Sequence, residues 1–370
     1  MSDRIGKQVT VELFGESHGP AIGAVIEGLA PGIALAMEQL RGEMDKRRPR
    51  GRISTARQEA DEVEFLSGVF QGRTTGTALC LVIRNGQQHS EDYSAMARLA
   101  RPSHADFSAQ AKYRGFQDYR GGGHFSGRLT APLVAAGAIC QQVLARHGVR
   151  VGTHIARLGG ETDAAFGPDP QPGIDLLARR AFPTLDEATG DRMRQRIEAA
   201  AAQGDSLGGE LETAVVGMPA GIGEPFFDSV ESVLAHLLFS IPGVKGVSFG
   251  AGFALAGMRG SEANDPFYRE GDAVRTRTNH SGGVNGGITN GMPLLIHCAV
   301  RPTPSIYQPQ QTVDLVTGEE ATLSIRGRHD PAIVHRARAV VDAMVAIGLT
   351  DLFARRYGYL WTGETACVTD

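Results

Sequence analysis

The first residues of the chain alternate between apolar and polar side chains and predict a hairpin. Residues 9–13 follow the period of two that is typical of a half-buried strand. A second apolar run, 21–29, follows a Gly-rich turn and is the expected partner strand. Apolar residues then recur at helical spacing and predict a helix over 36–47, which Pro49 ends. These apolar residues are Met37, Leu40 and Met44.

The remaining pattern predicts a mixture of strands and helices. Strands are expected at 61–70, 76–84, 149–157, 209–217, 246–256 and 291–300. Helices are expected at 128–147, 190–203, 229–240 and 334–356. The first of these helices is apolar nearly all round and therefore buried, with Gly148 as its C-cap. The last places one apolar face inward, formed by Val340, Met344 and Ile347. Segment 160–188, rich in Pro, Asp and Gly, is expected to be a surface excursion.

Because strands come in pairs rather than alternating strictly with helices, an α+β fold with antiparallel sheets is favoured over a doubly wound parallel sheet. A faint internal echo suggests duplication. "VIEGLAPGI" before the 36–47 helix resembles "VVGMPAGIG" before the 229–240 helix. Chance is the rival explanation, since Gly/Pro turns are common. We expect one domain over residues 1–370.

Composition narrows the class of protein. The 370 residues are 42% hydrophobic and carry a formal net charge of −4, which argues against general nucleic-acid binding. The four cysteines form no C-x-x-C pair, so free thiols in a reducing compartment are expected. No signal peptide and no apolar stretch long enough to span a membrane is evident. These features predict a soluble cytoplasmic protein.

The stretch "FGESHG" contains the first candidate for chemistry. Histidine titrates near neutral pH, so His18 is a natural proton donor, although a lone loop histidine is more often structural. Glycines on both sides allow a ligand to approach the backbone. Glu16, Ser17 and His18 also fit G-x-S-x-G, but a strand rather than a helix follows, which argues against a serine hydrolase.

Basic and Gly-rich stretches point to an anionic ligand. "KRRPRGRISTAR", 46–57, contains six cations, five of them arginines, whose planar fork matches phosphate and carboxylate. A solvated helix end or a nucleic-acid patch are the alternatives. "RPSHAD" at 101–106 and "DYRGGGHFSGR" at 118–128 precede the buried helix, whose N-terminus would add positive charge. A flexible surface loop is the structural alternative.

Two later stretches complete the set. "NHSGGVNGGITNG", 279–291, has the glycine spacing of a loop against a flat or phosphorylated ligand, but no helix follows as in a Rossmann fingerprint. "GRHDP", 327–331, places Asp330 and Pro331 before the last helix, where an N-cap alone would explain them. The histidines show no metal-ligand spacing, so no metal is expected.

Taken together and in order, these motifs resemble the chorismate synthase family over residues 10–350. The matching stretches are "GESHG", "RRP…GR", "RP-HAD…KY…DYRGGG", "IP-VKGV-FG-GF…MRGS-ND", "N-GG--GGI--G" and "GRHDP…RA". The resemblance implies helices packed between antiparallel sheets, internal pseudo-duplication and a homotetramer. It also implies a reaction, the 1,4-anti-elimination of phosphate from 5-enolpyruvylshikimate 3-phosphate to give chorismate, with reduced FMN.

The resemblance assigns roles to individual residues. His18 would protonate the leaving phosphate, His104 would protonate reduced flavin, and Ser17 with Asp330 would relay a proton. Substrate anions would be held by Arg47, Arg48, Arg52, Arg128 and Arg336. FMN would be held by His124, Phe125, Ser126, Pro242, Gly243, Gly286, Arg301, Pro302, Thr303, Pro304, Ser305 and Arg328. No segment for a built-in flavin reductase is evident, so an external reductant is expected.

The chain departs from the usual family pattern beside the triple glycine. His124 replaces an arginine, Phe125 a serine and Leu129 a glutamate. Elsewhere three further residues differ from the family: Ser103 replaces a glycine, Ala251 an aspartate and Arg301 a lysine. Because a histidine is charged only when protonated, we expect weaker or more pH-sensitive FMN binding. A charge-assisted hydrogen bond is worth roughly 1.5–3 kcal/mol.

Two rival functions stay open at this point. A divergent flavin-binding relative would keep the fold but change the substrate or reaction. A non-catalytic anion- or nucleic-acid-binding protein would use the 46–57 cluster and would lose binding with salt.

Overall fold

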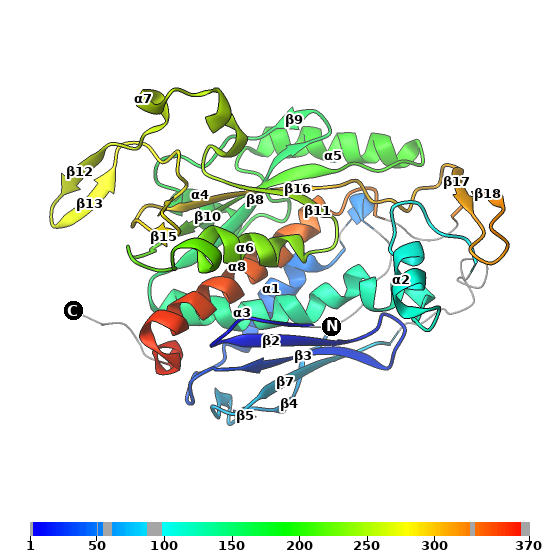
Figure 1. Cartoon of the computed structure of the whole chain (residues 1–370), viewed down its shortest axis with the longest axis horizontal. Coiled ribbons are helices and arrows are strands. Elements are labelled where there is room, and N and C mark those ends of the chain that lie inside the picture. Colours follow the sequence, from blue (N-terminus) through cyan, green and yellow to red (C-terminus); the bar gives the residue numbers. More distant parts are fainter. Residues whose placement is uncertain (1–2, 50, 55–60, 87–97, 326–329, 364–370) are drawn as a thin grey trace.

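The computed structural model describes residues 3–49, 51–54, 61–86, 98–325 and 330–363. Two five-stranded antiparallel sheets enclose a layer of helices (Figure 1). The first sheet has the order β1-β2-β3-β7-β4. Its strands are β1 (Arg4–Ile5), β2 (Thr10–Gly15), β3 (Ala21–Glu27), β4 (Glu64–Ser67) and β7 (Leu79–Arg84). The second has the order β11-β16-β10-β8-β9. Its strands are β8 (Arg150–Leu158), β9 (Glu161–Thr162), β10 (Gly209–Val216), β11 (Val244–Phe249) and β16 (Leu294–Val300).

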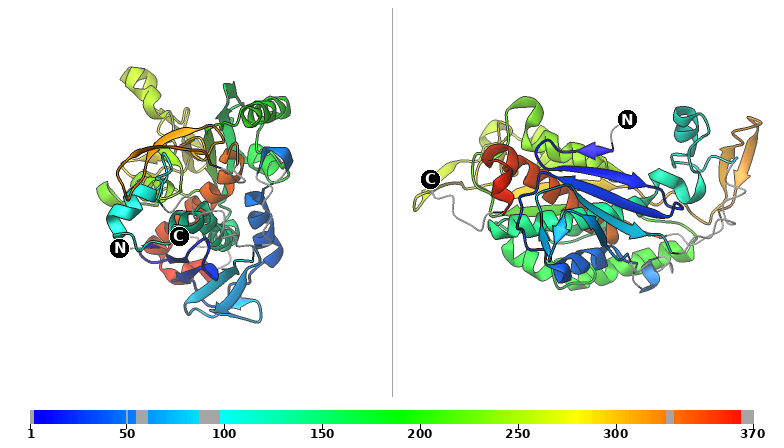
Figure 2. Two further views of the ribbon diagram at one scale, coloured as in Figure 1. Left: turned by 90° about the vertical axis from the view of Figure 1, so that its right-hand side faces the viewer. Right: turned by 90° about the horizontal axis from the view of Figure 1, so that it is seen from below.

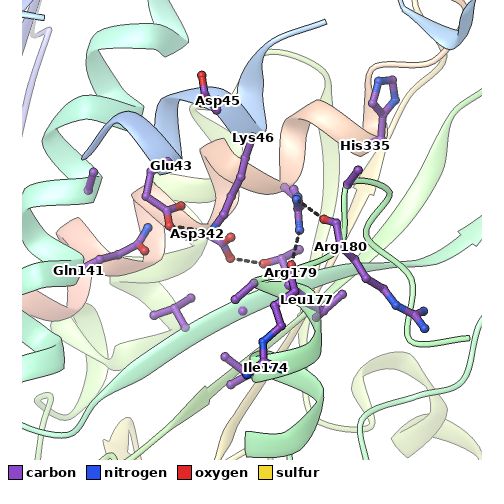
Figure 3. A pocket seen from close by; sticks show the side chains of 18 of the residues that line it. Glu43, Asp45, Lys46, Gln141, Ile174, Leu177, Arg179, Arg180, His335 and Asp342 are labelled. Carbon is purple, nitrogen blue, oxygen red and sulfur yellow. Dashed lines mark hydrogen bonds and ion pairs between the residues drawn. The ribbon is translucent and has the colours of Figure 1, made fainter. Parts of the chain in front are cut away.

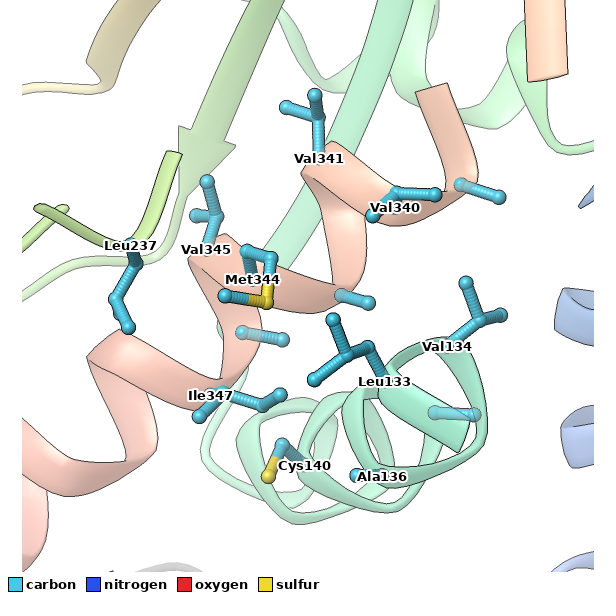
Figure 4. Close-up of a cluster of buried hydrophobic side chains, with 14 of the residues drawn as sticks. Leu133, Val134, Ala136, Cys140, Leu237, Val340, Val341, Met344, Val345 and Ile347 are labelled. Carbon is cyan, nitrogen blue, oxygen red and sulfur yellow. The ribbon is translucent and has the colours of Figure 1, made fainter. Parts of the chain in front are cut away.

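Four helices fill the space between the sheets. They are α1 (Met37–Arg47), α3 (Thr130–Arg146), α6 (Val230–Phe239) and α8 (Val334–Tyr357). Figure 4 shows side chains of α3, α6 and α8 meeting in one apolar cluster. The α3 and α8 backbones approach so closely that a Cβ at Gly137 would lie 2.2 Å from the Cβ of Ala343. One hydrophobic core therefore joins both sheets.

The other elements surround this core, and Figure 2 shows how they project from it. The helices are α2 (Asp106–Tyr113), α4 (Gln171–Leu177), α5 (Glu187–Ala202) and α7 (Gly260–Ala263). The hairpins are β5 (Val69–Phe70) with β6 (Arg73–Thr74), β12 (Phe267–Glu270) with β13 (Ala273–Thr276), β14 (Val284–Asn285) with β15 (Ile288–Thr289), and β17 (Gln310–Val313) with β18 (Glu320–Leu323). The 3-10 helices are η1 (Gly51–Ile53), η3 (Arg120–Phe125), η4 (Gly127–Leu129), η5 (Phe226–Asp228), η6 (Gly252–Gly257) and η7 (Tyr359–Gly363).

The two halves of the chain repeat one arrangement. The first half runs β2, β3, α1, β4, β7, α3, and the second runs β8, β10, α6, β11, β16, α8. In both sheets these four strands stand in the spatial order first, second, fourth, third. Figure 1 shows the two sheets on opposite sides of the shared helices. The faint sequence echo thus reflects a structural duplication.

Hydrogen bonds repeat with the fold. Thr74 Oγ1 accepts the N–H of Ile33 at 2.9 Å and donates to the carbonyl of Ala30 at 2.6 Å. Thr289 Oγ1 accepts an N–H at 2.9 Å and donates to a carbonyl at 2.6 Å in the same way. Its partners are Ile222 and Pro219. In each repeat one threonine therefore fixes the Gly/Pro turn that leads to the inner helix.

Most predicted elements are confirmed, with three corrections. Segment 160–188 is not merely a surface excursion, because it contains β9 and α4 and buries Ile174, Leu177 and Phe182. The predicted 246–256 strand ends at Phe249, since Gly250 takes a φ of 56° and the chain turns into η6. Helix α8 is buried on nearly every side rather than on one face, because helices and a sheet surround it.

One helical segment contradicts the expectation that no stretch is long and apolar enough to cross a membrane. Arg120–Arg146 passes that test by length and composition, with a mean hydropathy of 1.2. Because 89% of the apolar window is buried inside the protein, we interpret this segment as the central core helix.

Candidate active site

Most sequence candidates lie at one end of the molecule. Strand pairing places Gly15, Ala21 and Arg84 at one end of the first sheet. In the second sheet, Leu158, Gly209 and Val300 share an end. The N-termini of α3 and α8 lie at this same end, beside α2 (Figure 1). The positive ends of two helix dipoles therefore point toward the candidate residues, which favours bound anions.

The Glu16–Gly19 turn packs against the triple glycine. Ser17 N–H donates to the carbonyl of Gly123 at 3.1 Å. A Cβ at Gly121 would lie 2.3 Å from the His18 ring, and all three glycines have positive φ. Both Ser17 and His18 are buried. The triple glycine thus lets the backbone close over a buried histidine. The sequence of the triplet alone does not show this packing role.

The Ser17 hydroxyl has an unusual environment. Its Oγ is buried and has no hydrogen-bond partner among the described residues. Buried hydroxyls almost always have a partner, so this oxygen is available to a ligand at the candidate site.

Two candidate arginines share one carboxylate. Arg47 Nη1 lies 2.9 Å from Asp61 Oδ2, and Arg128 Nη1 bonds Asp61 Oδ1. Arg47 also donates to Thr130 Oγ1 at 2.9 Å, so the end of α1 is tied to the start of α3. All three charged residues are buried. Because both carboxylate oxygens are engaged, Asp61 fixes the orientation of both guanidinium groups.

Asn85 connects this arginine pair to the histidine turn. Its Nδ2 donates to the carbonyls of Glu16 at 3.1 Å and Gly19 at 2.8 Å. Its Oδ1 accepts from Arg128 Nε at 3.2 Å. The His18 turn and Arg128 are therefore held in one network.

Arg336 attaches the start of α8 to the same network. Its Nε donates to the backbone carbonyl of Arg47 at 2.7 Å, and its Nη1 bonds Asp330. Asp330 is thus held by Arg336, which is one of the candidate substrate-binding residues. The predicted N-cap is wrong, because Ile333 is the N-cap residue of α8.

His104 meets one of the predicted flavin residues. Its Nδ1–H donates to the carbonyl of Pro102 at 3.1 Å, and its Nε2 accepts from Ser305 Oγ at 2.9 Å. Burial and the charge of Arg101 lower the pKa of His104 to about 4. The imidazole is therefore neutral at pH 7, with its tautomer fixed by the carbonyl.

Arg101 and Arg301 supply charge near His104. Arg101 holds Asp106 bidentately, with Nε–Oδ2 and Nη2–Oδ1 distances of 2.7 Å. Burial alone would raise the pKa of the Asp106 carboxyl, but hydrogen bonds from Arg101 lower it overall. Arg301 N–H donates to the carbonyl of Gly243 at 2.9 Å, which brings the Pro242–Gly243 turn to segment 301–305.

The residues that depart from the family pattern take defined positions. His124 Nδ1–H donates to the carbonyl of Gly15 at 2.8 Å, and its Nε2 lies 3.4 Å from Asp3. Phe125 is 42% exposed and meets Tyr113 edge-on. Ser126 Oγ accepts the N–H of Arg128 at 3.3 Å. His124 thus supports the end of β2 rather than presenting both ring nitrogens to a ligand. Ser103 has a φ of 59°, a region that favours glycine.

Two further candidates lie elsewhere, and two lie wholly or partly outside the described residues. Gly286 lies in the β14–β15 turn, at the opposite end of the second sheet, because Thr289 pairs with the turn after β10. Arg48 pairs with Asp45 at 2.6 Å and lines a different cavity. The side chain of Arg52 and all of Arg328 lie outside the described residues.

Sequence analysis missed Asp61 and Asn85. Asp61 is the first residue of the predicted 61–70 strand, Asn85 directly follows the predicted 76–84 strand, and neither belongs to a motif of its own. The only available signal was position, since Asn85 directly follows a strand that ends beside the Glu16–Gly19 turn. This end of the molecule therefore has the arginines, helix N-termini and buried or half-buried histidines that suit a small anion.

Comparisons with known proteins identify the family. The chain matches the family model described as chorismate synthase over residues 9–354. The chorismate synthase of Thermococcus kodakarensis is 45% identical over 358 residues, covering 97% of this chain and 99% of the relative. That of Dehalococcoides mccartyi is 46% identical over 356 residues, covering 96% and 97%. A crystal structure titled as chorismate synthase aligns with a TM-score of 0.76 at 26% identity, covering 96% of this chain and 94% of that one. The chain belongs to the chorismate synthase family.

Proposed function

We propose that the protein is an enzyme of aromatic amino acid biosynthesis that converts 5-enolpyruvylshikimate 3-phosphate to chorismate. In this 1,4-anti-elimination the C–O bond to phosphate and one ring C–H bond break, and a new C=C bond forms. The carrying observation is that the family match spans residues 9–354 while Arg47, Arg128, Arg336 and His18 gather at one end. A substrate with one phosphate and two carboxylates suits three arginines beside two helix N-termini.

The arginine network has a defined role in binding. Asp61 offsets one of the two charges of Arg47 and Arg128 and holds their planes, so substrate anions meet preoriented donors. Arg336 contacts the end of α1, where it donates a hydrogen bond to the carbonyl of Arg47. Little side-chain entropy is then lost when the substrate binds.

His18 is the proposed acid for the leaving phosphate. Its ring is buried between the Glu16–Gly19 turn and Gly121, and Asp118 interacts with its charge. A histidine in such a place is able to donate a proton to a departing oxygen.

The site also fits reduced FMN. The Ser17 hydroxyl, which has no hydrogen-bond partner among the described residues, and the cations Arg101 and Arg301 are suited to a polar, phosphorylated ligand. His104, segment 301–305 and the Pro242–Gly243 turn would hold it, together with the 124–126 turn. When bound, reduced FMN supplies a transient electron and takes the ring hydrogen. An anion beside His104 would raise its pKa and let it donate a proton, whereas Ser17 and Asp330 would relay one.

We further propose a cytoplasmic homotetramer that obtains reduced FMN from a separate reductase. Gly286 belongs to a flavin site only if a neighbouring copy supplies it, because its hairpin caps the far end of the second sheet. The formal net charge of −4 and the burial of Arg47 in an ion pair with Asp61 argue against nucleic-acid binding through the 46–57 cluster.

An anaerobic turnover experiment tests this function. The protein is mixed with reduced FMN and 5-enolpyruvylshikimate 3-phosphate, and chorismate and phosphate are followed together. Equal amounts of both products are expected, and none with oxidised FMN. FMN binding without either product would instead support a divergent relative with a changed substrate or reaction.

A further inference from the structure

A cavity outside the candidate active site, called the second cavity below, borders α1 and α8. It has a volume of about 920 Å³ and is lined by α1, α3, α8, β8 and the 174–198 segment. Ser17, His18, Arg47 and Arg128 do not line it. Figure 3 shows α1 and α8 side chains on one side and the α4 end on the other. A cavity of this size accommodates a drug-sized molecule or a mononucleotide.

The lining is rich in charged groups. Its seven cations are Lys46, Arg48, Arg150, Arg179, Arg180, Arg194 and Arg338. Its four carboxylates are Glu43, Asp45, Glu198 and Asp342. Three of these cations, Arg150, Arg180 and Arg194, also pair with carboxylates outside the lining, so the cavity offers guanidinium groups to an anion without a large net charge.

Buried polar groups form the floor. Arg338 is 4% exposed and donates to the carbonyls of Leu177 and Arg180 at 3.3 and 3.1 Å. Asp342 is also 4% exposed, and its Oδ1 accepts from Thr153 at 2.6 Å. These contacts fix both charged groups at the bottom of the cavity.

A further polar side chain at the cavity, His335, has one ring nitrogen without a hydrogen-bond partner among the described residues. His335 lines the cavity and is 8% exposed. Its Nε2 lies 2.8 Å from Ser54 Oγ, but its Nδ1 is buried with no hydrogen-bond partner among the described residues. A ligand in the cavity would satisfy it.

The opposite wall is apolar. Ile53, Ile174, Leu177 and Phe182 line the cavity and are each buried to at least nine-tenths. Phe182 lies between the His335 ring and the Arg194 guanidinium, with a centroid distance of 6.1 Å to the first and a cation distance of 5.1 Å to the second. A molecule bound in the cavity would therefore contact both cationic groups and apolar side chains.

We propose that this cavity is a second binding site, separate from the catalytic one, for a small organic anion with an apolar ring or chain. Its anionic group lies toward Arg179, Arg194 and Arg338, and its apolar part lies against Ile174 and Leu177. The site shares the last turn of α1 with the active site, since Arg47 faces Asp61 while Lys46 and Arg48 face the cavity. This inference does not depend on the proposed reaction.

The test uses 8-anilinonaphthalene-1-sulfonate, an aromatic anion that fluoresces in apolar surroundings. Titration of the full chain is expected to show saturable binding that excess FMN does not displace. Arg179→Glu with Arg194→Glu is expected to raise the dissociation constant at least ten-fold. Ala145→Trp, which fills the cavity edge without changing charge, is expected to do the same.

Matched controls keep the test decisive. Arg41→Glu with Arg269→Glu reverses two exposed charges outside the lining, and Ala201→Trp adds an exposed indole on α5; both should leave binding unchanged. Circular dichroism shows whether each variant is folded. Equal affinity in the cavity variants and the controls overturns the proposal, as does displacement of the probe by FMN.

Discussion

The two repeats build the same scaffold but differ in the segment that joins their first two strands. In the first repeat, β2 and β3 are joined by residues 16–20, which include Ser17 and His18. In the second, β8 and β10 are joined by residues 159–208, which include α4 and α5 and wall the second cavity. The short connection brings buried polar groups to the helix N-termini, and the long one covers a sheet edge. The candidate catalytic residues Ser17 and His18 therefore lie in a connection rather than in the duplicated core.

The largest stability effect is expected at the carboxylate that serves the active-site arginines. Asp61→Asn leaves two buried guanidinium groups without their counter-charge, which should cost about 3–5 kcal/mol of unfolding free energy. It should also lower kcat/KM at least ten-fold, because both arginines lose their orientation. Urea unfolding and steady-state kinetics measure the two effects.

Asp351 in α8 is the matched control. Its Oδ1 accepts the backbone N–H groups of Lys7, Gln8 and Val9 at 2.7–3.0 Å, at the far end of the molecule. Asp351→Asn keeps that oxygen, so a cost of about 1 kcal/mol with unchanged kcat/KM is expected. Equal loss of activity in the two variants would contradict a special role for Asp61.

The next effect compares two helix glycines. A Cβ at Gly137 would meet the Cα of Ala343 at 2.3 Å, so Gly137→Ala must separate α3 from α8 and should cost about 3 kcal/mol. At Gly348 the obstacles are the side-chain ends of Leu237 and Leu234, which can rotate. Gly348→Ala should therefore cost about 1 kcal/mol or less, also by urea unfolding. A larger loss at Gly348 would refute this account of the helix crossing.

Thr74 and Thr289 test how far the duplication extends to energetics. Each hydroxyl satisfies one buried backbone N–H and one carbonyl. Replacing either by alanine should cost about 2 kcal/mol, and the two values should agree within about 0.5 kcal/mol. Thr→Ser should restore most of the loss at both positions. Clearly unequal losses of unfolding free energy would show that the threonine does not stabilise the turn equally in the two repeats.

The smallest effect is a pH dependence at His335. Burial lowers the pKa of His335 to about 4, below its ordinary value of 6.5. Its neutral form therefore stabilises the fold above pH 6.5, and this stabilisation is lost as the pH falls toward 4. Between pH 7 and 5.5 the cost of His335→Gln should shrink by about 1 kcal/mol, measured by urea unfolding. A cost that does not change with pH would show that His335 is not held neutral.

The sequence predicted the scaffold better than the site. Periodicity located β2, β3, α1 and α8, because each has a long, regular apolar pattern. It failed at 160–188, where the few buried apolar residues are separated by turn residues. Loop motifs and family resemblance pointed to His18 and His104, but Asp61 and Asn85 are single polar residues whose roles depend on contacts far along the chain.

Resemblance to the family also could not show which way each side chain points. Arg47 and Arg48 are adjacent in the sequence, yet Arg47 faces Asp61 and Arg48 faces the second cavity. The replacement of an arginine by His124 suggested a direct effect on FMN. The structure instead shows hydrogen bonding to Gly15, which would transmit any effect through the end of β2.

The most direct test of the account is a single-turnover comparison of His18→Ala with Asp169→Ala under saturating reduced FMN and substrate. Asp169 is an exposed residue of the long second-repeat connection. The account predicts that His18→Ala slows phosphate release by about 10²–10⁴-fold with substrate binding retained, and that Asp169→Ala matches the unmodified protein. Phosphate release at an unchanged rate in His18→Ala would contradict the claim that the first-repeat turn performs the chemistry.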